Sequence, residues 1–174
     1  MDWRDLIIDG YGRIFELLDP ALQGLSPVEL DKQPKAGCNS LGWTIWHLAR
    51  GQDSQIAGLG KSEQLWLKDG WHKRFNRPAD AEDSGFGHTP SDVAAFRSPT
   101  AAVLLEYCRA VVAASQRYLK SIDVKELDRV LDEPYQSKPT VGVRIVSIMA
   151  DCLEHAGEAA YIRGFIKSGN WLGY

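Results

Sequence analysis

Asp151 and His155 stand four residues apart in IMADCLEHAGEAAYIRG, residues 148–164, a stretch whose apolar residues recur with a helical period. Side chains four apart on a helix are neighbours, with Cβ atoms roughly 5–6 Å apart. The carboxylate and the imidazole can therefore converge on one ion. Their neighbours are largely apolar and would normally exclude both groups. The spacing predicts two metal ligands on a mostly buried helix.

A third ligand must come from another helix, and His47 is the candidate. It lies in LGWTIWHLARGQDSQIAGLG, residues 41–60, the other segment that combines apolar character with a histidine. Two imidazoles and one carboxylate suit zinc at a site with an open position, and also ferrous iron, nickel or cobalt. We therefore predict a divalent metal, zinc first, held by His47, Asp151 and His155.

A purely structural interpretation competes with the metal site. A lone histidine on a mostly apolar helix, such as His47, is more often a hydrogen-bonded core residue than a ligand. An acid and a histidine one turn apart, such as Asp151 and His155, can also form a simple side-chain hydrogen bond. Residue spacing leaves both interpretations open.

Three further residues accompany the predicted ligands. Glu158 lies three residues after His155 on much the same face, where it would hydrogen-bond a ligand, act as a general acid or base, or be a solvated charge. Trp43 lies one turn before His47 and is predicted to line a substrate pocket, with core packing as the alternative. Arg163, two turns beyond His155, would bind an anion or anchor a neighbouring helix.

Four long segments with helical periodicity position these residues, and no strand alternation is evident. They cover residues 3–22, 41–60, 98–122 and 141–167. The order of two helices, a long crossover and two more helices is that of a four-helix bundle with one long connection. We predict an all-α protein with a single domain over residues 1–174.

Several residues mark the expected helix boundaries. Ser26 and Glu29 have the spacing of a capping box for a short connecting helix. Ser98 is predicted as the N-cap of the third long helix, with Pro99 at its first position. Gly169 is predicted to stop the fourth.

The crossover, residues 61–97, is irregular and rich in glycine, proline, aspartate and aromatic residues. So long a connection in a compact domain is more often functional than an idle linker. We predict that it forms a lid over a ligand, with Trp66 and Trp71 as substrate-binding residues.

Composition limits the partners. The net charge of −3 gives no broad basic field for nucleic acid or an anionic membrane. No uncharged segment approaches the roughly 20 residues needed to span a bilayer, and the acidic N-terminus is unlike a secretory signal. The three cysteines are an odd number without CxxC spacing, which argues against a disulfide framework. We expect a cytoplasmic protein that acts on a small-molecule substrate.

The strongest functional indication is a family resemblance. NSLGWTIWHLARGQD, residues 39–53, resembles the second-helix motif of the DinB-like superfamily, which includes relatives of mycothiol-dependent maleylpyruvate isomerase. DCLEHAGEAAYIRGFIKSG, residues 151–169, resembles its last-helix motif, and LQGLSPVELDKQP fits its opening segment. The resemblance implies an up-down-down-up bundle, a divalent metal near one end and often a homodimer.

The family's ligands fall on His47, Asp151 and His155. Relatives usually have Glu or His where this chain has Asp151, whose side chain is shorter by a methylene than Glu, so metal affinity or preference is expected to shift. The resemblance implies an enzyme that activates a low-molecular-weight thiol for transfer or isomerisation, or water for hydrolysis. A stress-related protein that binds metal or a small molecule without turnover is the alternative.

Overall fold

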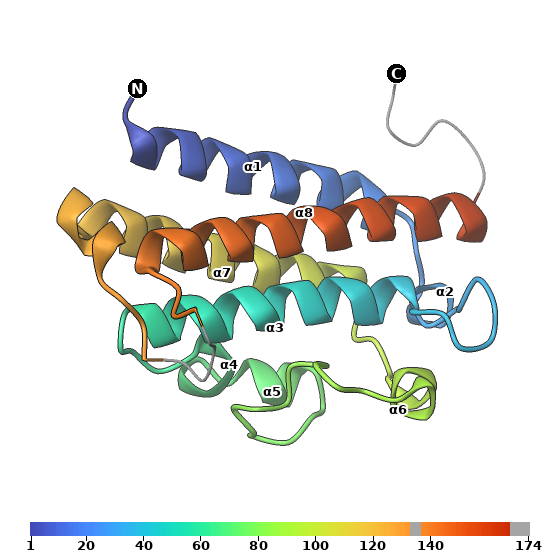
Figure 1. Ribbon diagram of the computed structural model, residues 1–174. Helices are drawn as coiled ribbons and strands as arrows, with labels where there is room; N and C mark the ends of the chain where they lie inside the picture. Colours follow the sequence, from blue (N-terminus) through green and yellow to red (C-terminus); the bar gives the residue numbers. More distant parts are fainter. Residues whose placement is uncertain (133–136, 168–174) are drawn as a thin grey trace.

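Four long helices form the body of the protein in the computed structural model, which describes residues 1–132 and 137–167. They are α1 (Trp3–Leu22), α3 (Leu41–Leu59), α7 (Ala101–Ser121) and α8 (Val141–Ile166) (Figure 1). Within the described ranges there is no β-strand, only an isolated bridge between Val130 and Thr140. The prediction of an all-helical protein is confirmed.

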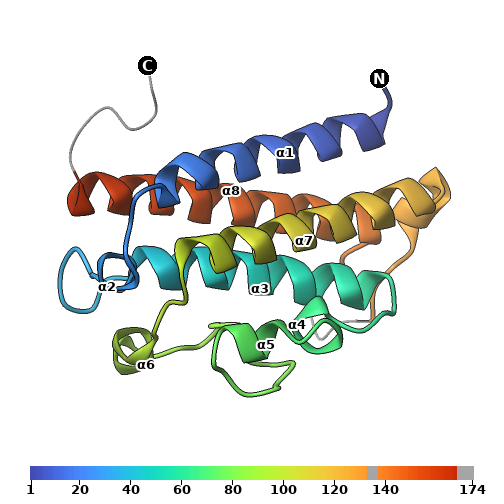
Figure 2. The ribbon, with the colours of Figure 1, turned by 180° about the vertical axis from the view of Figure 1, so that it is seen from behind.

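The long helices pack around one core. α3 lies beside α8 and α7, and α1 lies beside the same two helices (Figures 1 and 2). Each long helix contributes side chains that are almost completely buried, among them Leu18, Ile45, Leu104 and Ile148. Burial of such a side chain contributes about 1.5–3 kcal/mol relative to leaving it exposed. The apolar periodicity of the sequence thus becomes the core that fixes α3 against α8.

A side chain caps the N-terminus of each of the four long helices. Ser26 and Glu29 form the expected capping box at α2 (Pro27–Leu30). The predicted start of the third long helix was wrong, because the N-cap of α7 is Thr100, whose side chain accepts a hydrogen bond from the N–H of Val103. The N–H of Ser98 instead donates to Asp31, at 2.8 Å. α8 ends at Ile166, and the predicted stop at Gly169 lies outside the described residues.

The cysteines and the long helices agree with the expectations from composition. Cys38 is exposed, Cys108 and Cys152 are buried, and all three are free thiols. Of the helices described, none combines the length and apolar character needed to cross a membrane.

The crossover folds back along α3 as three short helices, α4 (Leu65–Lys68), α5 (Trp71–Arg74) and α6 (Pro90–Ala95) (Figure 1). η1 (Val124–Asp128) belongs to the later connection between α7 and α8. Two buried side chains of α3 hold the crossover. Asp53 accepts hydrogen bonds from the N–H groups of Leu65 and Trp66.

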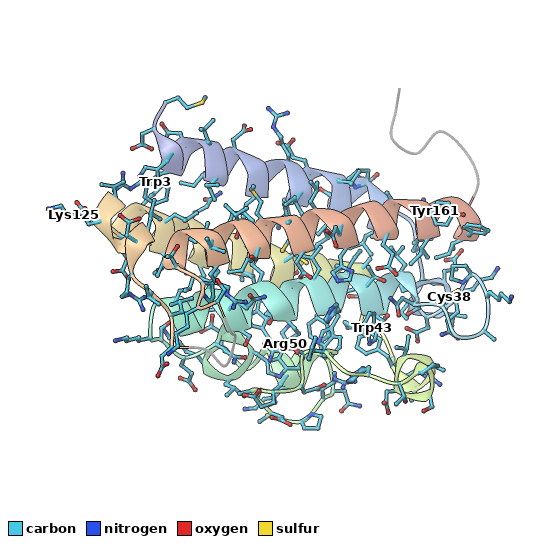
Figure 3. All side chains as sticks on the ribbon, viewed as in Figure 1. Trp3, Cys38, Trp43, Arg50, Lys125 and Tyr161 are labelled. Carbon is cyan, nitrogen blue, oxygen red and sulfur yellow. The ribbon has the colours of Figure 1, made fainter. Side chains whose placement is uncertain are left out.

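Arg50, fully buried, donates to the carbonyls of Ala81 and Asp83, each at 2.9 Å. Figure 3 shows Arg50 on the side of α3 that faces the crossover. Because a buried guanidinium is costly without partners, these contacts hold the segment around residue 83 against α3.

Candidate metal site between α3 and α8

His47 of α3 and His155 of α8 face each other, with ring centres 4.8 Å apart and planes at 82°. Oδ1 of Asp151 lies 3.7 Å from Nε2 of His155, one helical turn away. The other carboxylate oxygen of Asp151 lies against α3, since a Cβ at Gly51 would be 3.7 Å from Oδ2. The structure therefore places the predicted ligands on facing sides of two neighbouring helices, with His155 in contact with both His47 and Asp151.

Both histidines have their Nδ1 atoms hydrogen-bonded to oxygen. Nδ1 of His47 lies 2.6 Å from the carbonyl oxygen of Ser84, and because a carbonyl only accepts, Nδ1 carries the proton. Nδ1 of His155 lies 3.0 Å from Oε2 of Glu158. Each neutral imidazole is thereby left with an unprotonated Nε2, which is the state that a metal-ligating histidine needs.

The contact between Asp151 and His155 is too long for a hydrogen bond, because 3.7 Å exceeds the range for nitrogen and oxygen. His155 bonds to Glu158 instead. The carboxylate of Glu158 also accepts a hydrogen bond from the amide of Asn39, at 2.8 Å. The structure therefore places Glu158 as the group that orients His155.

The local environment separates the two histidines electrostatically. Burial lowers the pKa of His47 below its ordinary value, although the Ser84 carbonyl acts in the opposite direction. The hydrogen bond to Glu158 raises the pKa of His155, against the effect of burial. The same hydrogen bond lowers the pKa of Glu158. His47 is therefore the imidazole more readily neutral, and Glu158 is an ionised acceptor.

The donor set fits a divalent ion, although the side chains are not yet gathered around one. Within residues 1–132 and 137–167, no three His, Cys, Asp or Glu side chains form a ready metal-binding group. Two imidazoles that share an ion through Zn–N bonds of about 2.0–2.1 Å have ring centres roughly 5 Å apart, close to the 4.8 Å found here. The side chain of Asp151 is 44% exposed, which leaves its carboxylate room to rotate.

Trp43 lies flat on His47, with ring centres 4.8 Å apart and planes within 16°. Its indole N–H donates to Nδ1 of His88 in the crossover, at 3.1 Å. Trp43 is 5% exposed, so its ring is enclosed between the histidine and the crossover. This stacking fixes the plane of the His47 ring.

The crossover contributes residues to the candidate site that sequence reasoning did not identify. Gly85 adopts a φ of +88°, and a Cβ at this position would lie 2.8 Å from Nδ1 of His47 and 3.0 Å from the rings of Trp43 and Trp46. Only glycine lets the backbone approach so closely. The sequence signal for this close approach is the pair of glycines in SGFG, residues 84–87.

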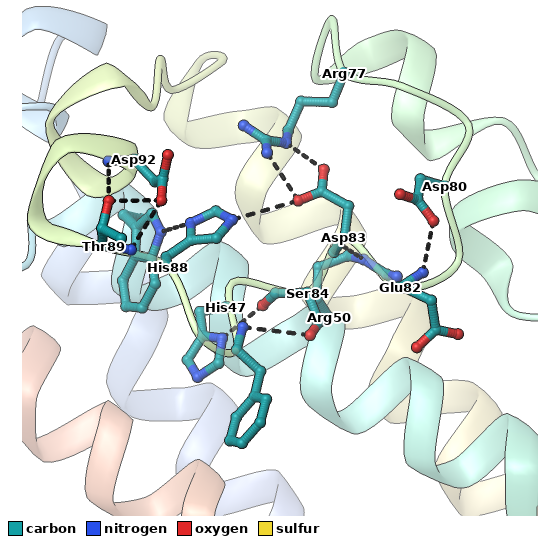
Figure 4. Close-up of polar contacts among 12 residues, drawn as sticks. His47, Arg50, Arg77, Asp80, Glu82, Asp83, Ser84, His88, Thr89 and Asp92 are labelled. Atoms are coloured by element: carbon teal, nitrogen blue, oxygen red, sulfur yellow. Dashed lines mark hydrogen bonds and ion pairs between the residues drawn. The ribbon is translucent and has the colours of Figure 1, made fainter.

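Asp83 secures the same loop. Both of its carboxylate oxygens accept hydrogen bonds from Arg77, at 2.7 and 2.8 Å, and Oδ1 lies 3.6 Å from Nε2 of His88. Figure 4 shows these contacts beside the bond between His47 and Ser84. A bidentate pair between an arginine and a carboxylate fixes the orientation of both side chains and also contributes binding energy. The loop that sets the His47 tautomer is therefore held from two sides.

The other predicted substrate-binding residues lie elsewhere. Trp66 is fully buried, and its ring contacts Trp46, Phe75 and Tyr107, with the guanidinium of Arg50 stacked above it at 4.7 Å. Trp71 is 8% exposed and packs on Tyr107. The structure places both tryptophans in the packing of the crossover on α3 and α7.

Arg163 is also removed from the pair of histidines. It is buried, and its Nη2 donates to the carbonyl of Gln23, the C-cap residue of α1, at 3.1 Å. This contact anchors the end of a neighbouring helix, which is one of the two roles predicted for Arg163.

The chain is similar to known proteins in sequence and in fold. The family model of the DinB superfamily matches residues 12–159. The structure is similar to the crystal structure of a conserved protein from Enterococcus faecalis, with a TM-score of 0.88, 31% sequence identity, and coverage of 95% of this chain and 98% of that one. No curated protein matches. The matched region contains α3 and most of α8, and the chain belongs to the DinB superfamily.

Proposed function

We propose that the protein is a metal-dependent enzyme in which His47, Asp151 and His155 hold one divalent ion. Zinc is the first choice, and nickel, iron and cobalt suit the same ligands. The observation that carries the proposal is the state of the two imidazoles. Each has its Nδ1 atom bonded to an oxygen acceptor, and the rings face each other across the gap between α3 and α8.

The proposed chemistry is thiol transfer or isomerisation on a small-molecule substrate, with hydrolysis as the second choice. When bound, the ion would lower the pKa of a coordinated low-molecular-weight thiol or water. The protein's own residues orient the ligands, because Glu158 and the Ser84 carbonyl fix the histidines and Trp43 fixes one ring plane. The thiol rests on the family resemblance.

A binding protein without turnover is the second candidate. The specific observation in its favour is the close cover over His47, where Ser84 and Gly85 approach within contact distance and Trp43 stacks on the ring. A site closed on this side would retain an ion without admitting a large substrate. The proposed location for either function is the cytoplasm.

The bundle connectivity and the assembly are part of the same proposal. The course of the long helices in Figures 1 and 2 supports up-down-down-up connectivity. A homodimer is supported by apolar side chains more than half exposed along α8, namely Val143, Val146, Leu153, Tyr161 and Phe165. A second copy can cover such a face symmetrically. Leu153→Glu is expected to shift the molar mass measured by light scattering from dimer to monomer.

Metal analysis of protein purified without an affinity tag tests the proposed site. The wild type should retain about one divalent ion per chain, and His155→Ala should lose it. His72→Ala is the matched control, because His72 lies in α5 with its ring against Trp66. Equal metal content in all three proteins would overturn the assignment. A substrate screen with and without thiol then separates an enzyme from a binding protein.

A further inference from the structure

A second polar site lies on the crossover, where three arginines line one hollow. This cavity of about 360 Å³ lies between α5 and the segment that joins α6 to α7, and Arg74, Arg77 and Arg97 line it. Among the described residues, no carboxylate side chain does so. Its volume is at the lower end of the roughly 300–1,000 Å³ typical of small-molecule sites. Arg74 and Arg77 pair with acids outside the lining, so Arg97 contributes the positive charge that has no acidic partner among the described residues.

Arg74 and Arg77 are each held in place by an acid and an aromatic ring. Arg77 donates from Nε and Nη2 to Asp83, and its guanidinium stacks over Trp46 at 4.6 Å. Arg74 donates from Nη2 to Glu106 at 2.6 Å and stacks over Trp71 at 4.6 Å. These contacts restrict the two side chains before any ligand arrives, so less rotamer entropy is lost on binding. Nη1 of Arg77 and Nη1 of Arg74 have no partner in the described part of the chain.

Arg97 carries the charge that no acid balances. Its Nη1 donates to the carbonyls of Ala94 and Phe96, at 2.8 and 2.7 Å. Carbonyls orient a guanidinium but do not neutralise it, and its Nε and Nη2 remain without partners among the described residues. Pro99 also lines the hollow, two residues before α7 begins at Ala101.

We propose that this hollow binds a small oxyanion, a phosphate or carboxylate group, through Arg74, Arg77 and Arg97. Guanidinium groups match the planar geometry of such anions and bind them through paired N–H donors. The amide of Asn76 and the hydroxyl of Ser98, which line the same cavity, supply further hydrogen-bonding groups. The site has none of the proposed metal ligands in its lining, although Arg77 also holds the loop that contacts His47.

Calorimetric titration at constant ionic strength tests the proposal, with inorganic phosphate in one arm and succinate in the other. Constant ionic strength keeps general screening equal between the arms. Arg97→Gln should weaken binding of the preferred anion about tenfold or more, since it removes the unbalanced charge. Arg117→Gln is the matched control, because this exposed arginine of α7 lines a different cavity. The control should change affinity by less than about twofold.

The choice of anion identifies the source of the oxyanion. Tighter phosphate binding assigns the hollow to phosphorylated ligands, and tighter succinate binding assigns it to carboxylates. Thermal unfolding of each variant checks that the fold is retained. If Arg97→Gln unfolds, Arg74→Gln takes its place, because Arg74 and its partner Glu106 are both more than 40% exposed. Binding of neither anion, or equal affinity in the arginine variants and the control, overturns the proposal.

Discussion

The carbonyl oxygen of Ser84 lies 2.6 Å from Nδ1 of His47, although 37 residues separate the two in the chain. This contact fixes the proton on Nδ1 and leaves Nε2 of His47 free toward α8 (Figure 4). Metal-ligating histidines usually donate their second ring N–H to such an acceptor. The crossover therefore adds a contact to the candidate site, whose predicted ligands all come from the long helices.

Gly85→Ala should weaken metal binding more than Gly87→Ala does. Both glycines have positive φ angles, +88° and +78°, so each alanine costs about 1–2 kcal/mol in backbone strain. A Cβ at Gly85 would also lie 2.8 Å from Nδ1 of His47, whereas a Cβ at Gly87 meets nothing within 4 Å. Urea unfolding and a competitive metal titration measure the two effects. Equal losses of metal affinity would show that the close approach to His47 is unimportant.

The two site histidines should titrate on opposite sides of the ordinary histidine pKa in the metal-free protein. Burial lowers the pKa of His47, and Glu158 raises that of His155. NMR titration of the imidazole protons measures both, and Glu158→Gln should lower the pKa of His155. Unchanged titration of His155 in that variant would exclude Glu158 as the cause.

The sign of the pH dependence follows from these shifts. The raised pKa of His155 contributes stability that is fully present below its unfolded-state pKa and is lost as the pH rises through the folded-state value. Metal binding has the opposite dependence, because His155 must lose its proton to act as a ligand. Metal affinity should therefore increase as the pH rises through the folded-state pKa of His155.

Arg50→Met should destabilise the fold and weaken metal binding together. Arg50 is fully buried, lies 3.5 Å from Asp53 and supports the carbonyls of Ala81 and Asp83. Removal of one partner of a buried ion pair costs about 3–5 kcal/mol. Arg13→Met, which removes an exposed pair with Asp9, should change neither property measurably. Urea unfolding and metal titration of both variants provide the comparison.

Trp66→Ala should lower the free energy of unfolding and leave ligand binding by the folded protein unchanged. The ring is fully buried among aromatic side chains, and truncation of a buried tryptophan costs about 3–5 kcal/mol. Unfolding in urea and metal content per folded molecule separate the two effects. Unchanged stability with altered ligand binding would support the lid role expected from the sequence.

Cobalt-substituted protein should develop a sulfur-to-metal charge-transfer absorption when 2-mercaptoethanol is added. Three protein ligands leave an open position at which a thiolate can bind. Asp151→Ala should change or remove the absorption. Cys152→Ser is the control, because the thiol of Cys152 is fully buried beside Gln52 and is not expected to reach the ion. No absorption at saturating thiol would favour hydrolysis or binding without turnover.

Local signals in the sequence predicted which helices carry the residues of the candidate site. The four-residue spacing of Asp151 and His155 places them together on any helix, and the apolar period identified α3 as the facing helix. Local signals failed at the start of α7, because serine and threonine both cap helices well. In the structure the N–H of Ser98 donates to Asp31, and Thr100 is the N-cap. The burial of Trp66 depends on how the crossover folds over α3, which periodicity does not specify.

The group that fixes the proton of His47 on Nδ1 is a backbone carbonyl and not a side chain. Because every residue type has a carbonyl, any side chain at position 84 can supply the same oxygen, so searches for pairs of interacting side chains would pass over it. The trace in the sequence is at the next position, where the absence of a side chain at Gly85 lets the backbone approach. A substitution at position 84 is thus expected to preserve the carbonyl contact, whereas one at position 85 is expected to push the backbone away from His47.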